Sequence, residues 1–272
     1  MISKNWIDNN KPILDIRHPD EYALQHIYQS TNIYLKQLDQ RLHELPTKEI
    51  PLWLIGNETL LEPAQQFLLS KGYILAGSNL INNIKTELLQ SGQQSKQLWQ
   101  PNFFLKEALN LLPNLTNKTV IDIGCGSGRD SVYMAMQKLK VLSIDVKKQA
   151  LEKAQLLANT HNVTIKTLQS NIEKAPFNPA PVNIVTVMRY LHRPLLQRIP
   201  NFILSNGYII YQTFMDGCQK FGSPKRQKYL LAHNELANTF LNFKILINRI
   251  DYLQDGRPVN SFLAKKLDKN LP

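Results

Sequence analysis

The most informative pattern of apolar and polar residues lies near the middle of the chain. Residues 119–130 read TVIDIGCGSGRD, in which an apolar run of the length of a buried parallel strand gives way to glycines. Gly124, Gly126 and Gly128 alternate, so the turn carries little side-chain bulk and its backbone N–H groups can approach a ligand. Residues 131–138 continue as a helix, whose N-terminus favours a polar or anionic ligand group. The segment therefore predicts a cofactor-binding turn.

Strands and helices alternate on both sides of this turn. The pattern predicts further strands at residues 140–146, 163–169, 182–188, 208–213, 244–252 and 261–267, and helices at 103–112, 195–204 and 234–240. This alternation is typical of a doubly wound α/β sheet, and the last two strands predict a closing hairpin.

The N-terminal third of the chain has an alternation of its own. Strands are predicted at residues 12–16 and 52–55, with helices that start at Pro19, near 36–45 and over 63–70. The segment 90–97, QSGQQSKQ, is polar and lacks apolar periodicity, so it predicts a domain boundary. We expect two α/β domains, at residues 1–92 and 98–272.

The charge is unevenly distributed between these two parts. The chain carries a net charge of +11, with −2 in residues 1–95 and +13 in residues 96–272. The basic part is compatible with an acidic substrate or a nucleic acid. The alternative is that its scattered lysines are only solvated, and this alternative is favoured because no exposed aromatic residues interleave with them.

Composition excludes several classes of protein. No signal-peptide pattern and no apolar run of bilayer length is present, so we expect a cytoplasmic protein that does not bind membranes. Cys125 and Cys218 are the only cysteines, too few for a disulfide framework. No resident metal is expected.

The spacing of the glycines distinguishes between two cofactors. In a dinucleotide fingerprint, GxGxxG, the third glycine would fall at Arg129, whereas here it is Gly128. The run from Ile121 to Gly128, hydrophobic-D-hydrophobic-GxGxG with Asp122 as its acid, resembles motif I of the class I S-adenosylmethionine-dependent methyltransferases. The resemblance implies a Rossmann-like, seven-stranded domain that binds S-adenosylmethionine. NAD binding is the alternative.

The same resemblance implies positions that hold the cofactor. Asp145 ends the next predicted strand, where doubly wound folds place a carboxylate on the ribose hydroxyls. Asn171 and Ile172 follow the third strand, where family members often carry an Asp beside an apolar residue to bind adenine; the Asn171 amide can still donate and accept. The predicted cofactor-binding residues are Asp122, Gly124, Cys125, Gly126, Gly128, Asp145, Asn171 and Ile172.

Acceptor-binding residues are predicted after the strand at 182–188, because ligands sit at the carboxyl ends of parallel strands. Tyr190 and His192 are expected to line the acceptor pocket, and the pKa of a histidine suits proton abstraction near neutrality. The alternative for His192 is a structural residue before the helix that Pro194 opens. The segments YLHRPL and QTF…FGSP resemble methyltransferases related to the tellurite-resistance enzyme, which implies a small or soft acceptor.

The segment 14–27, LDIRHPDEYALQHI, resembles the opening of rhodanese-like domains, with Gln25 in place of a glycine. The rhodanese reaction needs a thiolate in the loop after the strand at 52–55. That loop, Gly56–Leu60, contains no cysteine, so we expect a catalytically inactive module. Three roles for it remain open: binding a protein partner, packing on the second domain, or stabilising the chain.

Three functions follow from these observations. The preferred one is S-adenosylmethionine-dependent methyl transfer to a small molecule. The second is methylation of RNA or protein by the basic domain. The third is a non-catalytic S-adenosylmethionine-binding module, whose pocket would be blocked beside the methyl group.

Overall fold

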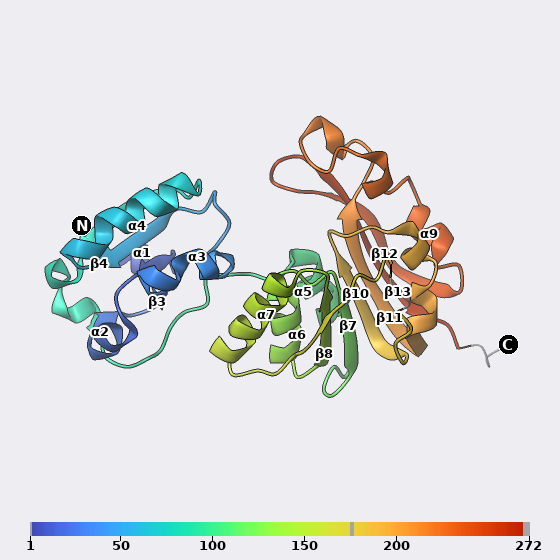
Figure 1. Ribbon diagram of the computed structural model, residues 1–272, viewed down its shortest axis with the longest axis horizontal. Coiled ribbons are helices and arrows are strands. Elements are labelled where there is room, and N and C mark those ends of the chain that lie inside the picture. The colour runs from blue at the N-terminus through green and yellow to red at the C-terminus, as the bar shows by residue number, and fades with distance from the viewer. Residues whose placement is uncertain (1, 175–176, 269–272) are drawn as a thin grey trace. The chain divides into compact units, whose positions relative to one another are not determined.

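The computed structural model describes residues 2–174 and 177–268 of the chain (Figure 1). The chain divides into two compact units, Met1–Gln100 and Pro101–Pro272. Each unit has its own sheet and its own buried apolar clusters, as expected of separate domains. Within the described residues, no helix is both long and apolar enough to cross a bilayer. Residues 269–272 of the predicted second domain lie outside the described part.

The first unit is built on a parallel sheet of four strands in the order β3-β1-β4-β5. The strands are β1 Ile13–Asp15, β3 Thr31–Asn32, β4 Leu52–Gly56 and β5 Leu75–Leu80. The helices are α1 Lys4–Asp8, α2 Pro19–Leu24, α3 Leu38–Arg41 and α4 Glu58–Ser70. A short antiparallel pair, β2 His26–Ile27 and β6 Leu89–Gln90, completes the unit.

Helix α4 begins earlier than the sequence predicted. The Asn57 side chain accepts a hydrogen bond of 3.2 Å from the backbone N–H of Leu60 and so caps the helix directly after β4. Pro63 lies inside the helix and removes one backbone hydrogen bond, but the burial of Ala64 and Leu68 keeps the helix on its sheet. The predicted start at residue 63 is therefore wrong, because this proline does not occupy the first turn.

The second unit contains a sheet of seven strands in the order β12-β13-β11-β10-β7-β8-β9. The strands are β7 Thr119–Ile123, β8 Lys140–Asp145, β9 Lys166–Gln169, β10 Val182–Met188, β11 Ile203–Phe214, β12 Phe243–Tyr252 and β13 Pro258–Lys266. Strands β7 to β11 are parallel, and β13 is antiparallel to both of its neighbours. The predicted Rossmann-like sheet with a closing hairpin is confirmed.

The helices of the second unit are α5 Phe103–Asn110, α6 Arg129–Met136, α7 Lys148–Thr160, α8 Arg193–Leu196 and α9 Glu235–Thr239. Helices α6 and α7 lie side by side against β8 (Figure 1). The predicted helix at 195–204 is wrong. Pro200 cannot continue an α-helix, so α8 ends at Leu196, a 3₁₀ turn follows, and β11 begins already at Ile203.

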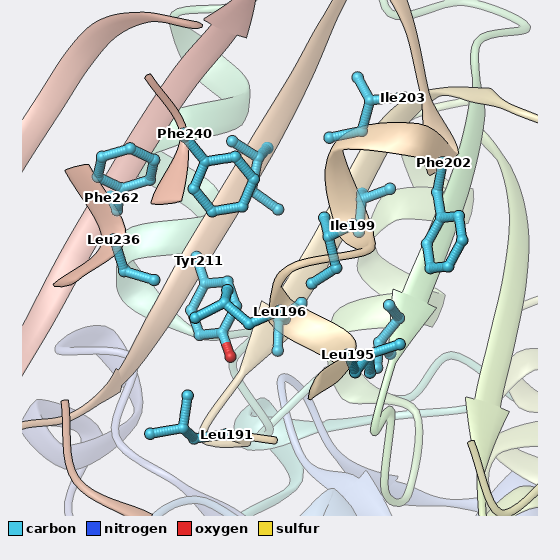
Figure 2. Close-up of a cluster of buried hydrophobic side chains, with 14 of the residues drawn as sticks. Leu191, Leu195, Leu196, Ile199, Phe202, Ile203, Tyr211, Leu236, Phe240 and Phe262 are labelled. Atoms are coloured by element: carbon cyan, nitrogen blue, oxygen red, sulfur yellow. The ribbon is translucent and has the colours of Figure 1, made fainter. Parts of the chain in front are cut away.

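A large apolar cluster lies against the sheet below α8 and α9. Figure 2 shows Tyr211 of β11 among Leu196, Leu236 and Phe240, all of them buried. The Tyr211 hydroxyl is the polar end of this cluster, and it donates a hydrogen bond of 2.8 Å to the backbone carbonyl of Tyr190. The core of the unit therefore fixes the chain directly after β10.

Candidate active site

The glycine turn between β7 and α6 forms the floor of the candidate site. Gly124, Gly126 and Gly128 have φ angles of +73°, +55° and +81°, the left-handed region in which glycine alone is unstrained. The backbone N–H groups of Gly124 and Cys125 both donate to the Ile144 carbonyl, at 2.8 and 3.0 Å, so β8 holds the turn. A Cβ atom on Gly126 would meet no other atom within 4 Å, which leaves open space above its backbone.

Asp145, the last residue of β8, is already hydrogen-bonded to the backbone around it. Its Oδ2 atom accepts from the Gly126 N–H at 2.9 Å, and its Oδ1 atom accepts from the Lys147 N–H at 2.8 Å. These two bonds fix the orientation of the carboxylate. Because a carboxylate has about four acceptor positions, roughly two remain for a ligand with hydroxyl groups.

A cavity of about 300 Å³ lies at the carboxyl ends of β7, β8, β9 and β10, a volume at the lower end of the range typical of small-molecule sites. It is lined by Gly124, Ile144, Asp145, Val146, Ser170, Asn171, Ile172, Glu173, Met188, Arg189 and Tyr190. Four of the predicted cofactor residues thus share one cavity with one of the predicted acceptor residues.

Asp122 lies in the core of β7 instead of on the cavity. Its carboxyl group accepts hydrogen bonds from the Ser131 hydroxyl and, at 2.9 Å, from the Thr186 hydroxyl, so it joins β7 to α6 and β10. Burial, with the neighbouring Asp130 second, raises the pKa of Asp122 to about 7. The structure therefore places Asp122 where it supports the turn from below.

Cys125, Gly126 and Gly128 also lie outside the set of residues that line the cavity. The Cys125 side chain is half-buried and lies 3.6 Å from the Gly126 carbonyl. Burial, followed by the charge of Asp122, raises the pKa of the Cys125 thiol, which keeps it protonated at neutral pH. Gly128 is the residue before α6.

Tyr190 is held from both ends. Its carbonyl accepts from Tyr211, and its hydroxyl donates a hydrogen bond of 3.0 Å to the Glu173 carboxylate across the cavity. Burial and this bond both raise the pKa of Tyr190, so the phenol is neutral at physiological pH. Its ring lies over the glycine turn, because a Cβ atom on Gly124 would be 3.4 Å from the Tyr190 Cβ.

His192 does not line the cavity. It is the residue before α8 and makes no side-chain cap there. Its Nδ1 atom is buried and has no hydrogen-bond partner among the residues described. The structure thus brings Tyr190, but not His192, into the site.

Glu173 of the cavity wall was not anticipated from the sequence, whereas Arg189 belongs to the segment after the strand at 182–188 that was expected to lie beside the methyl donor. Glu173 follows β9 in an irregular segment whose path no periodicity specifies. Only the fold brings Glu173 within hydrogen-bonding distance of Tyr190.

Comparison with known families assigns a class to each part of the chain. Residues 120–203 match the model of a methyltransferase domain, and residues 3–73 match that of a rhodanese-like domain. The first match contains β7, the glycine turn, Asp145 and the cavity residues that follow. The second contains β1 to β4 and α4.

Two relatives illustrate the range of similarity. An uncharacterized protein of Schizosaccharomyces pombe is 23% identical, and the match covers 94% of this chain and 93% of that protein. A ubiquinone biosynthesis O-methyltransferase of Vibrio cholerae is 26% identical, with 56% of this chain and 64% of that enzyme covered. The chain thus spans a little under two thirds of the enzyme it matches.

Solved structures share the fold of the second unit. TehB from Haemophilus influenzae matches with a TM-score of 0.51 and 19% identity, over 60% of this chain and 61% of that one. Magnesium protoporphyrin IX methyltransferase from Synechocystis, solved with bound SAH, matches with a TM-score of 0.50 and 13% identity, over 60% and 81%. At these identities the likeness is one of fold.

Proposed function

The chain joins a rhodanese-like domain to an S-adenosylmethionine-dependent methyltransferase domain, and from this premise we propose that it transfers the methyl group of S-adenosylmethionine to a small-molecule acceptor. The observation that carries the proposal is the cavity in which Asp145 and Asn171 face Tyr190. It offers polar groups for a nucleoside on one side and a tyrosine on the side where an acceptor would enter.

The residues present fit the cofactor. Asp145 is oriented by two backbone hydrogen bonds and has acceptor positions left for the ribose hydroxyls. Asn171 offers a donor and an acceptor for the adenine edge, with the buried Ile172 beside it as an apolar contact. The open space above Gly126 lets a ligand approach the backbone closely.

The main contribution of the protein to methyl transfer is to position the two reactants. S-adenosylmethionine, when bound, supplies a methyl group on a positively charged sulfur. An electron pair of the acceptor forms the new bond to the methyl carbon, and the sulfur leaves in line on the opposite side. Holding the acceptor at the attack distance is the main contribution of such a site. A general base is needed only for an acceptor that must lose a proton. The Tyr190 hydroxyl, bonded to Glu173, is the polar group of the cavity wall best placed to orient an acceptor.

The size of the cavity and one relative support a small-molecule acceptor. A cavity of about 300 Å³ suits a small molecule beside part of the cofactor better than a polymer. The Vibrio relative is named for O-methylation in ubiquinone biosynthesis, so phenols are the first acceptors to test here.

The test combines binding with transfer. S-adenosylhomocysteine should bind the full chain in calorimetry, and labelled S-adenosylmethionine should transfer its methyl group to one or more small molecules in a metabolite panel that includes phenols. Tighter binding of NAD than of S-adenosylhomocysteine would overturn the proposal. Label that entered only RNA or protein would leave a methyltransferase but refute the small-molecule acceptor.

A further inference from the structure

Arg189 occupies an unusual backbone conformation at the edge of the cofactor cavity. Its φ angle is +59°, in the left-handed region that non-glycine residues rarely adopt. The conformation is held by a hydrogen bond of 2.7 Å from its backbone N–H to the Gln212 carbonyl, on the neighbouring strand β11. Such conformations are strained in residues other than glycine, and they cluster at ligand sites. This bond fixes the backbone at Arg189 directly after β10.

The guanidinium groups of two arginines meet at one aromatic ring. The Arg189 guanidinium carbon lies 5.3 Å from the centre of the Phe214 ring, and that of Arg257 lies 4.8 Å from the same centre. Arg189 comes from the end of β10, whereas Arg257 precedes β13 in the hairpin. Two cations on one ring repel each other, so the partners of each guanidinium group decide whether its charge is offset.

The two arginines differ in their partners. Arg257 is anchored, because its guanidinium bonds the Asp255 carboxylate at 2.7 and 2.8 Å and the Ser223 carbonyl at 2.6 Å. The Arg189 guanidinium makes no hydrogen bond to any of the residues described. Its N–H donors are therefore available to a ligand, and Arg189 is one of the residues that line the cavity.

Charged residues of both signs act on Arg189. Arg129, Arg189 and Arg257 face Asp130 and Asp255, and each of the other four charges acts on Arg189. Burial, with Arg257 as the second cause, lowers the pKa of the Arg189 guanidinium, although this group stays charged at any physiological pH.

We propose that Arg189, with Arg257 behind it at the Phe214 ring, binds the carboxylate of the methyl acceptor, so that the substrate class is small organic acids. A guanidinium offers paired N–H donors that match a carboxylate in two parallel hydrogen bonds. Phe214 and Met188 provide apolar surface for an organic body next to the charge. The inference rests on the proposed function, because it assigns the acceptor of that same site.

The carboxylate could instead be that of the methionine part of the cofactor. These two sources share one chemistry, and the experiment has to separate them. It does so by measuring cofactor affinity and anion affinity on the same variants.

The experiment first measures S-adenosylhomocysteine affinity by calorimetry and then titrates the loaded full chain with benzoate, benzamide or inorganic phosphate at constant ionic strength. The melting temperature should rise with benzoate and stay constant with uncharged benzamide. In Arg189→Gln, benzoate affinity should fall by about tenfold or more, as for a lost charge-assisted hydrogen bond, while S-adenosylhomocysteine affinity changes by less than about twofold. Arg226→Gln removes the same charge from an exposed side chain of this domain and should change neither.

Several outcomes overturn the inference, and they can be told apart. If S-adenosylhomocysteine does not bind, the proposed function itself fails. If it binds but benzoate does not stabilise the loaded protein, only the carboxylate site is wrong. A loss of S-adenosylhomocysteine affinity in Arg189→Gln would assign the arginine to the cofactor, and stabilisation by phosphate but not by benzoate would assign a different substrate class.

Discussion

Gly128 and Ala154 lie so close that a Cβ atom on Gly128 would be 2.4 Å from the Cβ of Ala154. This contact lets α7 pack on the start of α6, and it gives the third glycine of the turn a structural reason of its own. Gly128→Ala should therefore destabilise the methyltransferase domain by about 2–5 kcal/mol, since it adds overpacking to a left-handed conformation. Calorimetric melting of the full chain would measure the loss.

Gly126→Ala is the matched control for this prediction. Its φ angle is +55°, but its added Cβ atom would meet nothing within 4 Å, so only the backbone strain of about 1–2 kcal/mol remains. Equal losses of stability in the two variants would contradict the packing role of Gly128.

Asp145→Ala should weaken binding of S-adenosylmethionine by about 1.5–3 kcal/mol, the range for hydrogen bonds to a charged group. The ribose hydroxyls would lose their carboxylate acceptor. The Gly126 and Lys147 N–H groups would also lose the acceptor that orders the turn. Titration calorimetry checks the affinity. Asp145→Asn, which keeps one acceptor oxygen, should lose less, and an unchanged affinity in Asp145→Ala would remove this residue from the cofactor site.

Asp122 should make the domain less stable as the pH rises from about 4 to 7. Its pKa is about 7 in the folded protein, above its ordinary value of 3.8, because burial disfavours the charge. The unfolded chain therefore releases this proton near pH 4, whereas the folded chain keeps it until about pH 7. The stabilisation by the protonated carboxyl is complete below pH 4 and is lost across that window, by as much as about 4 kcal/mol.

Hydrogen exchange of the β7 and β10 amides at about pH 5 and pH 7.5, corrected for the intrinsic exchange rate, would report this loss. Asp122→Asn stays neutral, so the pH dependence should be much smaller in this variant. Carboxyls that do not interact with Asp122 titrate in both proteins and cancel in the comparison, whereas Asp130 interacts with Asp122 and contributes to the difference. A wild-type profile parallel to that of Asp122→Asn would show that Asp122 is already ionised when folded.

The alternation of strands and helices along the chain and the position of the glycine turn could be predicted because they depend on local signals. One signal is the set of alternate glycines after an apolar run, and the other is the carboxylate at the end of the next strand. Each can be recognised from residues within one or two neighbouring elements of the sequence. The structure places Gly124, Asp145 and Asn171 on one cavity, which the parallel arrangement of their strands requires.

The remainder of the site depends on contacts between distant segments. A hydrogen bond to β11 holds the left-handed backbone conformation of Arg189. The Arg189 side chain shares the Phe214 ring with Arg257, which lies in a hairpin far along the chain. The segment with Glu173 lacks periodicity, so its approach to Tyr190 could not be predicted. Asp122 belongs to the predicted motif, but its pattern does not tell a core carboxyl from a ligand-binding one.

The rhodanese-like domain should show only background transfer of sulfur from thiosulfate to cyanide. The sequence between β4 and α4 has no thiol, and the structure leaves only Asn57 between the strand and the helix, where it acts as the cap. A persulfide anion needs a loop of backbone N–H groups around it, and here the segment is part of a helix. Turnover that disappeared on mutation of a residue from Gly56 to Leu60 would contradict this prediction.

The last prediction concerns the hydrogen bond between Tyr190 and Glu173. If this pair orients the acceptor, Tyr190→Phe and Glu173→Ala should each lower kcat by about tenfold, with unchanged affinity for S-adenosylhomocysteine. The double variant should be no slower than the slower single variant, because one interaction is removed in all three. His192→Asn serves as the comparison, since His192 lies outside the cavity, and it should keep both kcat and cofactor affinity. A fall of roughly a hundredfold in His192→Asn alone, at constant cofactor affinity, would instead make His192 the acid–base residue that its sequence position suggested.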